Sequence, residues 1–334
     1  MRDDPEQLDL FAWPGQPNPA PPLPVPEPPA RSSAVDISAL ATSELLGALE
    51  RLLDGALEST AVSRRLIDEV GRRRLTEAVP MLVELCRLHA GFDRARPVPE
   101  VAAALEALSV LAAGSAAGDI LKLVEQNALG ATASAAALRF FAVVRHRPAA
   151  RLARVSLSHE HAAVRASACA LVADLGQQEA LERLRDLSAD LDADVAAAAD
   201  LARGHLCDDA AKPALEQRLR VASAGEIPRL VRALVGVADA DTVVLLGRTA
   251  ARADSAARQV IVEALGQIDA PAAIVWLVRF AGDEHAAVRI AAARALPEHS
   301  DPRAVAALRS LVEDADPKVR EAVCAILCEF DQPA

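Results

Sequence analysis

Aromatic residues are almost absent from this chain of 334 residues: they make up 2% of it, as six Phe and two Trp, and Tyr is missing altogether. Apolar residues nevertheless make up 52%, so any core has to be built from Ala, Leu and Val. Sheets and barrels draw on aromatic and β-branched side chains, whereas a composition rich in Ala, Leu, Arg and Glu favours packed helices. The composition therefore excludes all-β folds and predicts an all-α protein.

Lysine is also scarce, and positive charge is in deficit. Only three of the 36 cationic residues are Lys, and 47 carboxylates give a net charge of -11, so the molecule as a whole repels phosphate backbones. Residues 60–155 nevertheless carry 14 cations against nine carboxylates, whereas residues 156–334 carry 19 against 28. The N-terminal half could thus present a basic patch, or simply a solvated face with partners at i,i+4 spacing. The arginines of this candidate patch are Arg64, Arg65, Arg72, Arg73, Arg74, Arg145, Arg147 and Arg151.

Signals for disulfides, export and membrane insertion are missing too. The five Cys include no CxxC pair, and the segment MRDDPEQLDLF is acidic where a signal peptide is basic and then apolar. No stretch offers about 18 strongly apolar residues. We therefore expect a reduced, cytoplasmic protein that does not enter a membrane.

No motif for catalysis, a cofactor or a metal is present. GxSxG, GxxxxGK[ST], HExxH and GxGxxG are all missing, so we predict a non-enzymatic protein without a cofactor. Two pairs of residues have the spacing of metal ligands, Cys86 with His89 and Cys324 with Cys328, but neither has further ligands at fixed spacing, which favours buried helix residues. The polar turn His159-Glu160-His161 is interpreted as the entry to a helix.

Proline divides the chain. Ten of the 21 Pro lie in the first 30 residues, and the run from Pro14 to Ser33 has almost no large apolar side chains, so it predicts a disordered tail over 1–37. As polyproline II, Pro14 to Pro29 would form a semi-rigid spacer of roughly 50 Å. PPLP and PEPPAR match loose WW and SH3 ligand patterns, which arise easily in any Pro-rich linker.

From residue 38 to about 330 the chain predicts short amphipathic helices that repeat. A shift of about 31 residues superposes several apolar positions in one frame, which is the signature of a solenoid. The Asp residues at 192, 254 and 316 are expected N-caps, and Pro271, Pro302 and Pro317 are expected at helix starts. Each unit is thus a pair of short helices that must stack on its neighbours. The superposed positions are Leu234, Leu265, Leu296 and Leu327; Leu246, Leu277 and Leu308; Ala233, Ala264 and Ala295; and Val243, Ile274 and Val305.

Three strings carry a family resemblance: AAVRASACALVADLG from Ala162, AAVRIAAARALP from Ala286 and DPKVREAVCAIL from Asp316. They resemble the second helix of bacterial HEAT repeats and the related HEAT-like repeats of phycobilin lyases. The resemblance covers roughly residues 38–330, is strongest after Ala162, and implies a right-handed α-α superhelix of about nine helix pairs. It bears on architecture far more than on activity, because the matching residues are packing residues.

Arginine recurs at one position of the repeat, in Arg165, Arg258, Arg289 and Arg320. In HEAT families this Arg commonly pairs with loop Asp residues, which implies a structural ladder with Asp283 and Asp314, both in frame. A ladder that binds phosphates or an acidic partner is the alternative.

Two alternative functions follow from resemblance. HEAT-like DNA glycosylases use a basic groove with Trp residues, so a DNA-binding or DNA-repair protein using the Arg-rich N-terminal half stays open, although the one Trp of the repeat region, Trp276, lies in the acidic half. A phycobilin-lyase-like chaperone is a further alternative, to be tested by retention of a bilin.

The sharpest motif is QLDLF, formed by Gln7, Leu8, Asp9, Leu10 and Phe11. It matches the QL[SD]LF pentapeptide with which many bacterial replication and repair proteins bind the DNA polymerase sliding clamp. That resemblance implies that Leu10 and Phe11 enter an apolar cleft and that Gln7 makes directional hydrogen bonds. Packing of LDLFAW on the first repeat is the alternative, and so is no role at all.

These observations predict a HEAT-repeat scaffold over 38–330 that binds a protein partner on an extended concave surface. They also predict that the N-terminal peptide tethers it to the sliding clamp. Direct binding of nucleic acid is left open.

Overall fold

A computed structural model describes residues 36–55, 60–299 and 301–330, with side chains to residue 328 in the last range. The chain divides into two compact units, Met1–Leu40 and Ala41–Ala334. Within the first unit, the described residues form a short 3-10 helix, η1 (Ile37–Ala39), whose start is capped by the Asp36 carboxylate. The predicted tail 1–37 otherwise lies outside the described residues.

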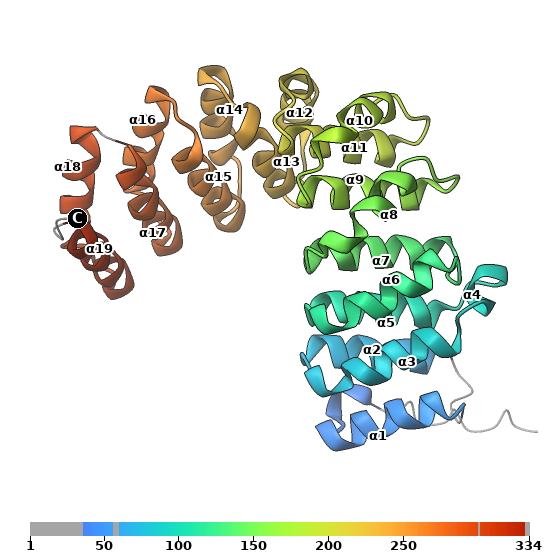
Figure 1. Ribbon diagram of the computed structural model, residues 1–334. Helices are drawn as coiled ribbons and strands as arrows, with labels where there is room; N and C mark the ends of the chain where they lie inside the picture. The colour runs from blue at the N-terminus through green and yellow to red at the C-terminus, as the bar shows by residue number, and fades with distance from the viewer. Residues whose placement is uncertain (1–35, 56–59, 300, 331–334) are drawn as a thin grey trace, which may run out of the picture. The chain divides into compact units, whose positions relative to one another are not determined.

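The described part of the second unit is built of helices that pack as consecutive pairs (Figure 1). One helix of each pair belongs to a layer that we call the first-helix layer, and the other to the second-helix layer, in which each helix packs on the next. The first-helix layer comprises α1 (Thr42–Leu53), α3 (Val79–Leu88), α6 (Ala117–Glu125), α8 (Ala150–Ser156), α10 (Leu181–Leu187), α12 (Lys212–Val221), α14 (Ala240–Ala250), α16 (Pro271–Phe280) and α18 (Pro302–Leu311). The second-helix layer comprises α2 (Thr60–Arg72), α5 (Pro99–Val110), α7 (Ala131–Val143), α9 (Ala162–Asp174), α11 (Ala193–His205), α13 (Ile227–Leu234), α15 (Ser255–Gln267), α17 (Ala286–Ala295) and α19 (Pro317–Phe330).

The prediction of an all-α, HEAT-like solenoid is confirmed, and the described residues form nine such pairs. One extra helical turn, α4 (Phe92–Ala95), interrupts the repeat between α3 and α5. The buried carboxylate of Asp93 holds this turn in place, because it accepts hydrogen bonds from the N–H groups of Val98 and Gly130, both at 2.7 Å. Within the described residues, no helix is long and apolar enough to span a membrane.

The predicted helix starts are present. Asp192 accepts hydrogen bonds from two N–H groups of the first turn of α11, and Asp254 caps α15 in the same way. Pro271, Pro302 and Pro317 occupy the first position of α16, α18 and α19. Proline suits this position because its missing N–H would have no partner inside the helix.

Small side chains at the centre of the second helices explain the Ala-rich composition. One position of the repeat is occupied by Ala168, Ala199, Leu230, Ile261 and Ala292, all buried, and three of these five are alanine. Alanine there lets helix axes approach closely, and close packing removes the need for aromatic filling. The two large aromatic exceptions, Phe140 and Phe141 on α7, are also fully buried.

The connection after the second helix changes along the chain. From α2 to α11, the residue two positions past each second helix has positive φ, and a 3-10 turn then leads into the next first helix. Glycine fits this conformation best, yet only Gly176 provides it. After α13 and α15 the chain becomes extended instead, at Ala238 after the 3-10 turn that follows α13 and at Ile268 directly after α15. The non-glycine residues with positive φ at this position are Arg74, Ala112, Arg145 and Cys207.

The 3-10 turns of the second unit lie beside these connections. Five precede a first helix: η2 (Thr76–Ala78), η3 (Gly114–Ala116), η4 (Arg147–Ala149), η5 (Gln178–Ala180) and η6 (Asp209–Ala211). Two follow a second helix: η7 (Val235–Val237) and η8 (Leu296–Glu298).

Candidate partner-binding groove

Hollows in the surface of the second-helix layer adjoin one another from α7 to α17. The largest, about 700 Å³, lies among α7, α9, α11, α12 and α13. A second of about 430 Å³ shares His205 and Arg232 with it, and a third of about 530 Å³ shares Glu263 and Gln267 with the second. Because neighbouring hollows share lining residues, they form one continuous surface, which we call the groove.

The groove follows from the repeat. Residues 31 apart occupy the same place on successive second helices, and two places four residues apart point out of the layer. Arg139, Leu201, Arg232, Glu263 and Arg294 stand at the first place. One helical turn later, at the second place, are Asp174, His205, Gln267 and Glu298. Side chains at i and i+4 lie side by side on a helix, so the two places form a double row across the helices.

The floor of the largest hollow is made of small residues. Six alanines of α9 and α11 line it, together with Leu201 and the buried Leu230. Short side chains expose the helix backbones, so a bound chain can approach them closely. The alanines are Ala166, Ala170, Ala173, Ala197, Ala198 and Ala202.

Four arginines border this floor, and they differ in their hydrogen-bond and ion-pair partners. Arg139 donates to the Ser167 hydroxyl and to the exposed Glu106, both at 3.3 Å, and Arg218 donates to the Ala197 carbonyl at 3.1 Å. Arg229 and Arg232 are exposed on α13, three residues apart, and form no ion pair within the described residues. Two like charges at this spacing repel each other, and an anionic partner would relieve the repulsion.

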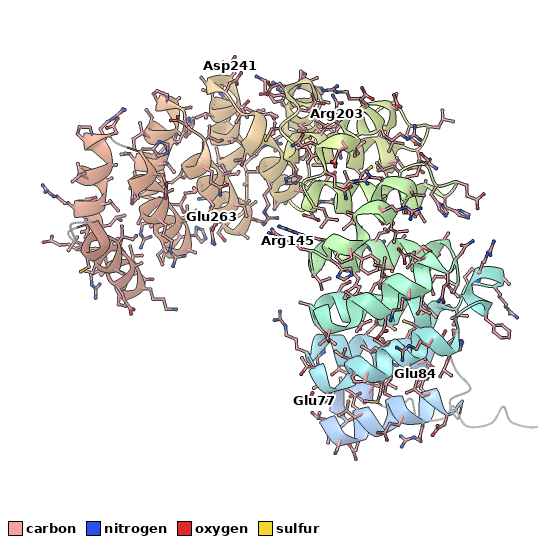
Figure 2. All side chains as sticks on the ribbon, viewed as in Figure 1. Glu77, Glu84, Arg145, Arg203, Asp241 and Glu263 are labelled. Carbon is pink, nitrogen blue, oxygen red and sulfur yellow. The ribbon has the colours of Figure 1, made fainter. Side chains whose placement is uncertain are left out.

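Two titratable side chains of the groove, the carboxylate of Asp174 and the imidazole of His205, are partly desolvated. Asp174 and His205 retain solvent-accessible surface, but the surrounding protein raises the pKa of Asp174 and lowers the pKa of His205. In each case desolvation is the main cause, since it penalises the charged form. Their mutual attraction and the nearby Arg145 oppose the shift of Asp174; Figure 2 labels Arg145 just after α7 and Glu263 on α15.

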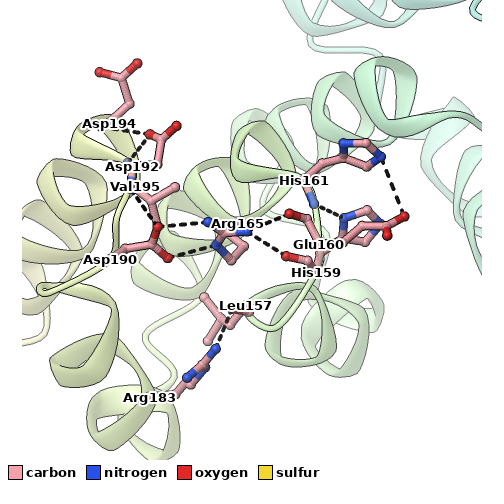
Figure 3. Close-up of polar contacts among 10 residues, drawn as sticks. All are labelled: Leu157, His159, Glu160, His161, Arg165, Arg183, Asp190, Asp192, Asp194 and Val195. Carbon is pink, nitrogen blue, oxygen red and sulfur yellow. Dashed lines mark hydrogen bonds and ion pairs between the residues drawn. The ribbon is translucent and has the colours of Figure 1, made fainter.

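The repeated arginines do not line the groove, because they bind loops. Arg165 donates two hydrogen bonds, of 2.8 and 2.9 Å, to the carboxylate of Asp190 in the next repeat (Figure 3). It also donates to the carbonyls of His159 and Glu160 in its own repeat. Asp190 in turn accepts from the Asp192 N–H at 3.0 Å. We call such an Arg–Asp link between consecutive repeats a strap.

Two more straps link consecutive repeats, one through two hydrogen bonds to the Asp carboxylate and one through a single hydrogen bond. Arg289 grips Asp314 with two bonds of 2.8 Å, and Arg258 pairs with Asp283 at 2.8 Å. The strap side chains of these two pairs are 7–18% exposed, so they have little surface left for a ligand. Hydrogen bonds from Arg289 are the main cause of the lowered pKa of Asp314.

The straps are interrupted in the middle of the chain. Ala196 and Ile227 occupy the Arg position in two successive repeats, and Val221 and Arg252 occupy the corresponding Asp positions. In the repeat of α11, a different network is present: Arg185 and the buried Arg203 both bind Asp208, and they lower its pKa to about 2 against the effect of burial. Arg203 is labelled in Figure 2.

The last repeated arginine, Arg320, donates to the carbonyls of Asp314 and Ala315 in its own repeat. It pairs with no carboxylate within the part of the chain that the structure describes.

The eight arginines of the candidate basic patch fall into two groups. Five lie on α2 or directly after it, whereas Arg145, Arg147 and Arg151 lie around α8, beyond α5 and α7 in the order of packing. Arg72 and Arg73 both bind Glu69 and lower its pKa to about 2, chiefly through these hydrogen bonds. This pairing leaves less unneutralised charge at α2 for a phosphate backbone.

The two cysteine pairs differ in exposure. Cys86 is completely buried, and burial raises the pKa of its thiol to about 12, which disfavours the thiolate that binds metals. Cys324 and Cys328 are exposed on α19. Within the described residues, the one group of ligands with suitable spacing is Asp283, Glu284 and His285, and Arg258 already neutralises Asp283.

The turn formed by residues 159–161 enters α9, with His161 at the N-cap. The His161 N–H donates to His159 Nδ1 at 3.1 Å. A neutral His159 in this arrangement therefore carries its proton on Nε2, which leaves no lone pair there for a metal.

Some predicted residues lie outside the described part of the chain, and some residues of the straps and the groove were not predicted from the sequence. The five residues of QLDLF lie outside the described residues. Asp190 was missed as a strap partner although it stands in frame with Asp283 and Asp314. Arg229 and Arg232 were missed as well, although the period of 31 residues places Arg232 and Glu263 at the same position of successive repeats.

Comparison with known proteins finds a family match at the C-terminal end of the chain. Residues 274–334 match the family described as HEAT repeats. Among solved structures, human deoxyhypusine hydroxylase is similar at 20% identity and a TM-score of 0.33, over 81% of this chain and 98% of that one. An engineered protein is similar at 16% identity and a TM-score of 0.45, over 84% and 87%. No curated protein matches the chain.

Proposed function

We propose that this protein is a non-enzymatic scaffold that binds a protein partner along the groove. The observation that carries this proposal is the set of adjoining hollows, which combine an alanine floor with Arg229 and Arg232, two exposed arginines that form no ion pair within the described residues. Stacked helix pairs provide extended surfaces of this kind, and such repeats commonly use them to bind other proteins. The straps support this interpretation, because they assign the repeated arginines to the scaffold and leave the groove to the partner.

The N-terminal peptide would supply a second contact, with the bacterial sliding clamp. Leu10 and Phe11 are two large apolar anchors, Leu8 adds apolar contact, and Gln7 adds a directional amide. Anchors that fill preformed pockets carry most of the energy of such short interfaces. The Pro-rich run after the motif supports the proposal, because a polyproline II spacer, which its composition predicts, would hold the peptide away from the repeats.

Titration of purified bacterial clamp against the full chain tests the tether. We expect binding in the micromolar range and a loss of at least about tenfold for Leu10→Ala/Phe11→Ala, since each anchor typically contributes more than 1 kcal/mol. The control is Leu23→Ala/Val25→Ala, which removes apolar residues of the spacer and should leave affinity unchanged. Equal affinity of the wild type and the anchor variant would remove the tether from the proposal.

A further inference from the structure

The charges along the groove are ordered. The hollow among α7 to α13 is lined by four arginines against three carboxylates, and one of these, Glu226, is already bound by the Ser223 N–H and hydroxyl. The hollow at α15 and α17 is lined by a single arginine, Arg294, against the carboxylates of Glu263, Asp269 and Glu298. One groove therefore has a cationic section followed by an anionic section.

We propose that the groove takes a protein segment whose charges run in the opposite order. Its acidic residues would lie on Arg229 and Arg232, and its basic residues would follow on Glu263 and Glu298. This inference rests on the proposed function and adds the chemistry and the direction of the partner. A nucleic acid does not fit, because its uniform negative charge would meet an excess of carboxylates in the second section, three against one arginine.

The dimensions fit a short segment. Neighbouring helices pack 8–10 Å apart, so the groove from α7 to α17 covers roughly 45 Å. An extended chain advances about 3.3 Å per residue, so about 14 residues fill it. The alanine floor on α9 and α11 accommodates small side chains ahead of the acidic residues, and the charged residues set the direction of the segment through electrostatic complementarity.

A synthetic peptide of about 14 residues tests the order of charge. Its first third carries Ala, its middle third carries Glu, its last third carries Lys, and a photo-crosslinking residue stands among the Glu residues. Fluorescence anisotropy with the full-length protein should show saturable binding, and mass spectrometry should place the crosslink on α12 or α13. A crosslink on α15 or α17, equal binding of a scrambled peptide, or competition by duplex DNA would overturn the proposal.

Charge reversal provides the decisive comparison. Arg229→Glu/Arg232→Glu should weaken binding of the peptide by at least about tenfold, because two attractive contacts become repulsive. Adding Glu263→Lys/Glu298→Lys should restore binding with the crosslink moved to α15 or α17. The matched control is Arg248→Glu/Arg309→Glu, which changes exposed arginines of the first-helix layer by the same charge. Equal weakening in the control would show that net charge, and not the groove, governs binding.

Circular dichroism should show unchanged helix content in every variant. The outcome is separable from the tether: clamp titration reports on Leu10 and Phe11, whereas the peptide reports on the groove. Failure of the peptide to bind, with the clamp still bound, would overturn the charge order and leave the tether intact.

Discussion

The strap between Arg289 and Asp314 is a polar contact at the edge of the layers, and we expect it to contribute measurably to the free energy of unfolding. Arg289→Ala would remove two bonds of 2.8 Å to the carboxylate and two to the carbonyls of Asp283 and Glu284. Asp314 would remain 9% exposed without its counter-ion. Removing one partner of a buried ion pair costs about 3–5 kcal/mol. Asp314 keeps its bond from the Asp316 N–H, so we expect a loss of about 2–4 kcal/mol.

The assay is urea denaturation of the full chain, followed by helix content, with hydrogen exchange on α17 and α19 because repeat arrays can unfold in parts. Arg303→Ala is the control. Arg303 forms an exposed ion pair with Asp301, so its removal should lower the free energy of unfolding much less than Arg289→Ala does. The double variant Arg289→Met/Asp314→Leu should recover much of the loss, because replacing both charges leaves neither unpaired. A loss for Arg289→Ala no larger than for Arg303→Ala would refute the structural role of the strap.

Three further predictions concern the backbone, the packing and the pH dependence. Ala112→Gly should stabilise the chain by about 0.5–1 kcal/mol, because φ is +48° there and glycine adopts that region without strain; Ala170→Gly inside α9 should instead destabilise it by about 1 kcal/mol. Gly247→Ala should cost about 1–3 kcal/mol in urea denaturation, because the new Cβ would overlap the Trp276 indole, and a smaller loss would show that the indole can shift. The folded pKa of Asp208 is lowered to about 2 from 3.8, so its contribution is present above pH 3.8 and is lost as pH falls toward 2. Asp208→Asn should flatten the acid limb of stability against pH, and an unchanged limb would contradict this assignment.

Local signals in the sequence predicted the helix pairs, because the start of each helix depends on a few adjacent residues. Asp254 caps α15 and Pro302 opens α18 through bonds within one turn, so spacing alone was sufficient. The repeat was harder to follow before α5, where α4 adds a turn. That insertion is held by Asp93, whose bond to Gly130 spans 37 residues, and no periodic pattern encodes such a contact.

The groove could not be predicted from charge counts along the chain. The positive balance of residues 60–155 includes residues of both layers, and Glu69 already neutralises part of it. The groove instead combines residues from several repeats, such as Arg139, His205 and Arg232. Their grouping depends on which helix positions the neighbouring layer leaves uncovered, and a sequence specifies this only after the helices have been paired.

The straps give one structural reason why this chain uses Arg in place of Lys. A strap requires one cation to bind both oxygens of a carboxylate and also two carbonyls, as Arg165 does. The guanidinium fork can do this, whereas an ammonium group acts as a point charge with three donors. Arginines used in this way are nearly neutralised and remain in the scaffold. Arg229 and Arg232 form no ion pair within the described residues and lie together in the groove, and in a molecule of net charge -11 this local positive charge is what an acidic segment would recognise.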